Sequence, residues 1–185
     1  MQEQVDLSIY DNSWYKPGKS TLMLVLWYAV NAVVFKSYFF PFFKLKVFLL
    51  RMFGAEIGEG VLIKPNVNIK YPWRLKIGDH SWIGEEVWID NLAEVSIGRN
   101  CCLSQGCFLL CGNHDYKKTT FDLIIKPIVL EEGSWVGAKT TIAPGAHLKS
   151  HAIVSAGSFF SGVAEEYTIY AGNPAKEVRK RVVSV

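Results

Sequence analysis

The chain has 185 residues, half of them hydrophobic, and a formal net charge of +3 at pH 7. This length suits one domain with a modest appendage, and so small an excess of positive charge gives no argument for nucleic-acid binding. Its four cysteines form no CxxC pair, which speaks against a zinc or thioredoxin-like site. Free thiols and the lack of a signal-peptide pattern at the start predict a cytoplasmic protein.

Residues 1–53 carry the whole excess of positive charge. They hold six Lys/Arg against three Asp/Glu, whereas residues 54–185 hold fourteen of each. An apolar run over 22–35 is too short to span a bilayer comfortably, and Pro41 should break any long helix. We expect an N-terminal segment of two helices with aromatic and basic edges.

Two roles fit this N-terminal segment, and they do not exclude each other. One is peripheral contact with a membrane through residues 14–53, because aromatic and basic side chains favour the headgroup region. The residues concerned are Trp14, Trp27, Tyr28, Lys36, Lys44, Lys46 and Arg51. The other is a cap or a subunit interface, since the ends of a repeat structure need covering.

Residues 54–172 follow a six-residue period. Large apolar residues recur at Ile57, Ile63, Ile69, Ile77, Ile83, Ile89, Ile97, Leu103, Leu109, Leu130, Val136, Ile142, Leu148, Val154 and Phe160. A smaller residue follows four positions later, with Trp73 and Asn113 as exceptions, and two extra residues follow each of the first two coils. Period six fits neither an amphipathic helix nor a simple alternating strand. It predicts an all-β fold, a parallel β-helix of about five coils whose large and small residues point inward.

The inward positions also explain two of the cysteines. Cys101 and Cys107 stand at the small position, where a buried thiol acts as a small hydrophobic side chain.

The period fails over residues 110–129, between Leu109 and Leu130. A long excursion in a compact repeat is usually functional or disordered, and this one begins with His114 and Asp115 where the chain leaves the coil. Position alone leaves two alternatives open, a catalytic base or a loop histidine paired with Asp115. The remaining histidines (His80, His147 and His151) stand at outward or turn positions and are expected to be ordinary surface residues.

Several motifs resemble those of the hexapeptide-repeat O-acetyltransferases, which include maltose and galactoside acetyltransferases. They are Ile97-Gly98-Arg99-Asn100, Gly112-Asn113-His114-Asp115 and Trp135-Val136-Gly137. The chain is most similar to the colanic acid biosynthesis type, through Trp88-Ile89-Asp90-Asn91-Leu92, Ser104-Gln105-Gly106 and His114-Asp115-Tyr116. The resemblance covers roughly residues 55–180.

This resemblance implies a left-handed β-helix and a homotrimer that binds CoA between neighbouring subunits. It also implies acetyl transfer from acetyl-CoA to a sugar hydroxyl, with no metal required. The acceptor would be a sugar or a lipid-linked oligosaccharide in exopolysaccharide or surface-glycan biosynthesis, at the inner face of the cytoplasmic membrane.

The resemblance further suggests site residues. His114 matches the general base, and Asp90, Asn91 and Asp115 lie near the acceptor. The residues that match the CoA site are Trp135, Ala138, Ala156, Gly157, Lys176 and Arg179. Ser161-Gly162 stands where the family often has Thr-Lys, so Lys180 or Arg181 could supply a phosphate contact instead. We expect residues 173–185 to form a basic tail or a short helix.

Two alternatives use the same fold. One is a non-catalytic β-helix scaffold. The other is a protein like the γ-class carbonic anhydrases, which need three histidines converging on zinc across a subunit interface; here only His114 is well placed.

Overall fold

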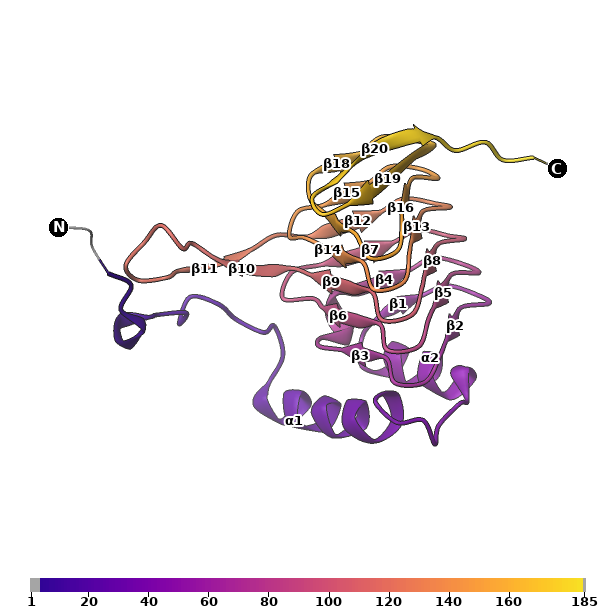
Figure 1. Cartoon of the computed structure of the whole chain (residues 1–185). Coiled ribbons are helices and arrows are strands. Elements are labelled where there is room, and N and C mark those ends of the chain that lie inside the picture. The colour runs from indigo at the N-terminus through magenta and orange to yellow at the C-terminus, as the bar shows by residue number, and fades with distance from the viewer. Residues whose placement is uncertain (1–3, 185) are drawn as a thin grey trace.

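The six-residue period folds into a parallel β-helix, as predicted (Figure 1). The computed structural model describes residues 4–184. One sheet contains β1 (Glu56–Ile57), β4 (Leu75–Ile77), β7 (Val95–Ile97), β12 (Ile128–Leu130), β15 (His147–Leu148) and β18 (Val163–Ala164). The second contains β2 (Leu62–Ile63), β5 (Trp82–Ile83), β8 (Cys102–Leu103), β13 (Trp135–Val136), β16 (Ile153–Val154), β19 (Thr168–Gly172) and β20 (Ala175–Lys180). The third contains β3 (Asn68–Ile69), β6 (Trp88–Asp90), β9 (Phe108–Leu110), β14 (Thr141–Ile142) and β17 (Phe159–Phe160). Five coils are complete, and β18 and β19 begin a sixth.

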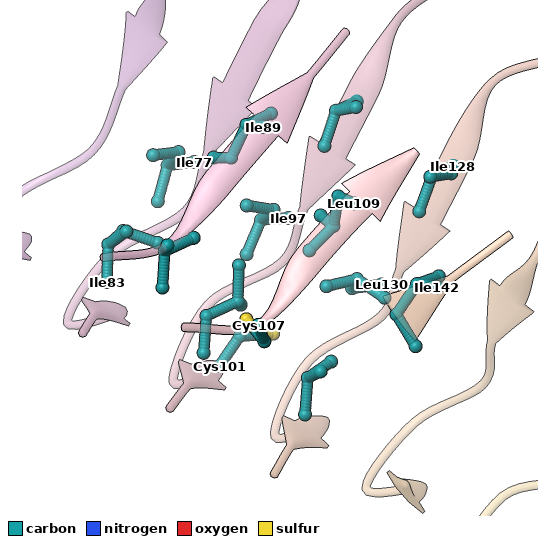
Figure 2. Packing of buried hydrophobic residues seen from close by; sticks show 14 of the residues in the cluster. Ile77, Ile83, Ile89, Ile97, Cys101, Cys107, Leu109, Ile128, Leu130 and Ile142 are labelled. Atoms are coloured by element: carbon teal, nitrogen blue, oxygen red, sulfur yellow. The ribbon is translucent and has the colours of Figure 1, made fainter. Parts of the chain in front are cut away.

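The core is the column of large residues that the period predicts. Every one of them is at most 8% exposed, and Figure 2 shows Ile77, Ile97 and Leu109 stacked along the interior. Cys101 and Cys107 are buried among them, and burial raises the pKa of the Cys101 thiol to about 11 and that of Cys107 further. The expectation that these thiols act as small hydrophobic side chains is therefore confirmed.

The turns between strands bring successive coils into close contact. A Cβ atom on Gly137 would lie 2.4 Å from the backbone nitrogen of Ala156 in the next coil. Only glycine fits at that approach, which explains why glycine follows the large residue in several repeats.

All the irregularities of the repeat lie at one corner of the coil. The extra residues follow β3 and β6, with a 3₁₀ turn over Pro72–Arg74 in the first case, and the long excursion follows β9. The excursion is an antiparallel hairpin of β10 (Gly112–His114) and β11 (Leu123–Ile125). It projects away from the stack (Figure 1).

Two N-terminal helices cap the first coil. In α1 (Thr21–Val30) and the π-helical turn after it (Asn31–Phe35), Trp27 and Asn31 face the coil, and Trp27 Nε1 donates to Ile69 O at 2.9 Å. In α2 (Phe43–Met52), Lys46 is fully buried and its Nζ donates to Lys64 O at 2.8 Å. No helix within residues 4–184 has the length and apolar character needed to cross a bilayer.

This packing corrects part of the membrane interpretation. Trp27 and Lys46 face the coil, so they are not available to lipid. Arg51 is occupied as well, because its Nε and Nη2 donate to the carbonyl of Ile57.

The C-terminal residues form a strand where we expected a tail or a helix. Strand β20 pairs antiparallel with β19, with Ala171 opposite Lys176 and Ile169 opposite Arg179. The edge of β19 offers unpaired backbone groups, and β20 satisfies them.

Candidate active site

The hairpin at the irregular corner holds His114. Strand β10 pairs with β11 so that Gly112 lies opposite Ile125 and His114 opposite Leu123. His114 is half-buried at the end of β10, where the antiparallel pairing gives way to the loop.

The imidazole of His114 is held in one orientation. Its Nδ1 lies 2.9 Å from Phe121 O, and the Phe121 ring stacks on it with centroids 4.4 Å apart and planes 6° apart. Because a carbonyl oxygen only accepts, Nδ1 must carry the proton in this hydrogen bond, and the neutral ring then has its lone pair on Nε2. The Tyr10 ring lies against the imidazole at 5.6 Å. The geometry therefore suits Nε2 to take a proton from a bound group.

An N-terminal strap, residues 6–19, runs along the same corner. Asp6 N donates to Thr119 O in the hairpin at 2.9 Å, and Trp73 Nε1 donates to Pro17 O at 2.7 Å. Between them, Tyr15 donates its hydroxyl to Leu92 O at 2.9 Å, and burial raises the pKa of Tyr15 to about 12, so that it stays a donor. The strap thus lines the corner from the hairpin to α1.

Two of the residues expected at the acceptor have local roles. Asn91 is fully buried, with Oδ1 accepting from Tyr71 N at 2.9 Å and Nδ2 donating to Tyr71 O at 2.6 Å. The Asp115 carboxylate accepts from the backbone N–H of Lys117 at 3.2 Å, which stabilises the hairpin loop. Neither the Asp115 carboxylate nor the Asn91 amide is hydrogen-bonded to His114.

Asp90 lies in a cavity of about 510 Å³ between α1 and strands β3 and β6. Lys70 Nζ forms an ion pair with the buried Asp90 Oδ1 at 2.8 Å, and no further donor reaches that oxygen within residues 4–184. Aromatic rings of Tyr71 and Trp88 line the cavity, and His114 does not.

The residues expected at CoA lie together on the outward face of the second sheet and its turns. Trp135 on β13 is 44% exposed and donates from Nε1 to Ser104 Oγ at 2.9 Å. Ala138 and Gly157 belong to successive turns joined by a hydrogen bond of 2.8 Å, with the exposed Ala156 beside them.

Lys176 and Arg179 extend this strip. They pair with the outward residues Ala171 and Ile169, and both side chains are exposed. Lys180 and Arg181 do not extend the strip. Lys180 Nζ donates to Thr168 Oγ1 at 2.7 Å, and Arg181 Nη1 donates to Gly133 O at 2.8 Å. Structural contacts therefore occupy the two side chains that we considered as substitutes for a phosphate contact.

Within one chain, His114 and the residues expected at CoA lie on different sides of the coil. The hairpin with His114 projects from one side, and β13 lies at the opposite side of the stack (Figure 1). Among residues 4–184, no three His, Cys, Asp or Glu side chains form a cluster that could hold a metal ion.

The sequence singled out His114 as a candidate but gave no sign of the residues around it. Phe121 lies seven positions after His114, and Tyr10 lies far before it in the chain. Neither residue belongs to a recognisable motif. Only the folded hairpin and the strap bring them to the imidazole.

Solved structures share this architecture. A hexapeptide-repeat-containing acetyltransferase of Vibrio cholerae matches with a TM-score of 0.79 at 20% identity, covering 88% of this chain and 94% of that one. A galactoside acetyltransferase in complex with coenzyme A matches with a TM-score of 0.68 at 21% identity, covering 74% and 70%. No family model matches the sequence.

A relative shows the family. Over 165 residues the sequence is 36% identical to the "Putative colanic acid biosynthesis acetyltransferase WcaF" of Escherichia coli K12, covering 89% of this chain and 91% of that protein. The chain belongs to the hexapeptide-repeat acetyltransferases. As a hexapeptide-repeat acetyltransferase it is an acyltransferase, which decides against the scaffold and the carbonic anhydrase alternatives.

Proposed function

We propose that this acetyltransferase moves an acetyl group from acetyl-CoA to a hydroxyl of a sugar or a lipid-linked oligosaccharide, with His114 as the general base. The observation that carries the proposal is the hydrogen bond of 2.9 Å between His114 Nδ1 and Phe121 O. It fixes the tautomer that leaves Nε2 free to accept a proton.

The chemistry needs no acyl-enzyme. A sugar hydroxyl is a weak nucleophile at neutral pH, so His114 Nε2 removes its proton as the oxygen attacks the thioester carbonyl. A backbone N–H stabilises the tetrahedral oxyanion. When the intermediate collapses, the C–S bond breaks, and the imidazolium returns the proton to the CoA thiolate. The products are an O-acetyl sugar and free CoA.

The substrate class rests on relatives. WcaF carries a colanic acid biosynthesis name. A second relative, the "Putative lipopolysaccharide biosynthesis O-acetyl transferase WbbJ" of Escherichia coli K12, is 27% identical over 115 residues, covering 55% of this chain and 58% of that protein. Both names concern surface polysaccharides, which supports exopolysaccharide or surface-glycan assembly as the setting. The outward strip with Trp135, Lys176 and Arg179 would hold acetyl-CoA, and Asp90 beside its cavity would contact the acceptor.

The separation of the two residue groups supports a homotrimer. A chain by itself places His114 and the Trp135 strip on different sides, whereas a cyclic assembly brings the hairpin of one subunit to the strip of the next. Three equal sites would result.

The test is a transfer screen with His114→Ala. The wild-type protein is assayed with acetyl-CoA against free sugars, nucleotide sugars and lipid-linked oligosaccharides, and the best acceptor is used for the variants. We expect kcat to fall by about 10²–10⁴, with CoA affinity and the melting temperature almost unchanged.

The control is His147→Ala, which removes an imidazole from β15 outside the corner and should keep wild-type kcat. Retention of more than about a tenth of kcat by His114→Ala would contradict the assignment of the base.

A further inference from the structure

Helix α1 is apolar on all sides, although only one side is covered. No charged residue occurs between Thr21 and Phe35. Trp27 and Phe35 pack on the first coil, while Leu22 and Leu26 on the uncovered side are 69% and 48% exposed. A helix that is hydrophobic all round is normally buried or in contact with lipid.

The uncovered surface continues past α1. Tyr38 donates its hydroxyl to Glu86 Oε1 at 2.7 Å and so fixes the connection between the helices, while the neighbouring Phe39 is 91% exposed. In α2, Phe48 and Met52 are exposed on the side away from the buried Lys46. Together with Leu22 and Leu26, these residues belong to an end face, defined as Leu22, Leu26, Val33, Phe39, Phe42, Phe48 and Met52. Figure 1 shows α1 and α2 at the end of the stack opposite β20.

The N-terminal stretch that forms this end face carries charges of one sign. No Asp or Glu occurs between Asp11 and Glu56. Four exposed lysines of this stretch (Lys16, Lys19, Lys36 and Lys44) form no ion pair with any residue in 4–184. Lys19 and Lys36 lie just beyond the two ends of α1 and its π-helical turn, where their long side chains can reach past an apolar surface.

We propose that the end face docks on an anionic lipid bilayer, with α1 lying in the plane of the interface. At ten residues α1 is about 15 Å long, which is half the hydrocarbon thickness, so it lies along the surface rather than across it. The exposed aromatic side chains at the edge suit the headgroup region of a bilayer. The lysines at both ends suit its negatively charged surface.

The same charges argue against a second copy as the occupant. A symmetric contact through this face would bring the lysines of both copies together, and residues 12–55 supply no carboxylate to pair with them, so like-charge repulsion opposes it. An anionic lipid surface supplies the missing negative charge.

Vesicle flotation with the full chain tests the proposal and does not depend on acetyl transfer. Vesicles of phosphatidylcholine alone are compared with vesicles that also contain phosphatidylglycerol, at low and high salt. We expect the protein to float with the anionic vesicles at low salt and to be released at high salt, because salt screens exposed charges.

Two variants with matched controls locate the contact. The double variant Lys19→Gln with Lys36→Gln should weaken partitioning by about 30-fold, whereas Lys117→Gln with Lys126→Gln, which removes the same charge from the hairpin region, should not. The triple variant Leu22→Ser, Leu26→Ser and Phe39→Ser should lose flotation. Its control, the same change at Val178, Val182 and Val183 near the other end of the stack, should keep it. All six of these positions are exposed, so the fold should tolerate the changes.

Three results would overturn the proposal. The protein could stay at the bottom of every gradient, or it could float equally with neutral and anionic vesicles. The end-face triple variant could also change the mass measured by light scattering, which would show that copies of the chain cover this face. None of these outcomes bears on whether His114 is the base.

Discussion

Single residues decide how the corner next to the site is built, and Asn91 is the clearest case. Its fully buried side-chain amide accepts a hydrogen bond from Tyr71 N and donates one to Tyr71 O. In Asn91→Asp the donor to Tyr71 O is lost and a buried charge faces that carbonyl, so we expect the free energy of unfolding to fall by about 3 kcal/mol. Urea denaturation measures this, with Asn100→Asp at an exposed turn as the control. A stable variant with a raised KM for the acceptor would instead place Asn91 at the acceptor.

Lys46 gives a prediction about pH. Burial lowers the pKa of Lys46 from its ordinary value of 10.5 to about 8. Between these two pH values the unfolded chain holds a proton that the folded chain has released, so unfolding becomes less favourable as pH rises. The contribution of Lys46 therefore destabilises the fold below pH 8 and vanishes above pH 10.5.

In the variant Lys46→Met, the free energy of unfolding should not show this rise with pH. The lost hydrogen bond to Lys64 O costs about 1 kcal/mol at every pH, so the slope of unfolding free energy against pH is the quantity to compare. Urea unfolding at about pH 8 and about pH 10.5 measures it, and Lys44→Met on the exposed side of α2 is the control. Parallel curves for Lys46→Met and the wild type would show that Lys46 is charged in the fold.

At the scale of elements, strand β20 positions two of the proposed CoA ligands. Lys176 and Arg179 are exposed on the outward face, beyond Trp135 and Ile169. Changing both to Glu should raise KM for acetyl-CoA by about tenfold or more, with kcat at saturation little changed, because the contacts bind the nucleotide phosphates equally before and during the reaction. Steady-state kinetics measures this. An unchanged KM would mean that β20 is only a solvated edge strand.

Elements differ in how well the sequence predicts them. The strands of the coil were predictable because each buries its large residue in one narrow core, and that demand repeats every six positions. Strand β20 was not, because main-chain bonds to β19 hold it while its side chains remain in solvent, so no apolar pattern marks it. The same holds for the candidate site: the break in the period pointed to His114 as a candidate base, whereas Tyr10 and Phe121 reach it only through the strap and the hairpin.

The whole molecule should be a trimer with sites shared between subunits. Light scattering of the wild type at micromolar concentration should give three times the mass of the chain. His114→Ala and the Lys176→Glu, Arg179→Glu variant should each be weakly active alone at low acetyl-CoA. Unfolding and refolding them together should restore activity, with about a quarter of the sites combining two intact halves.

The comparison for this experiment is each variant refolded by itself, which should stay weak. If mixing restores nothing although mixed trimers form, then both halves of each site come from the same chain.

The closure of the coil beneath the hairpin has a consequence for how this scaffold can diversify. Lys126 N donates to Cys111 O at 3.0 Å where the chain returns, and β12 pairs directly with β7, Ile128 opposite Val95, as if nothing intervened. The coils therefore do not depend on what lies between residues 111 and 126, and this segment is an exchangeable cassette. Lengthening such a surface loop adds little entropic cost. A descendant of this chain could acquire a new acceptor by replacing that cassette alone, while the coils and the proposed acetyl-CoA strip remain untouched.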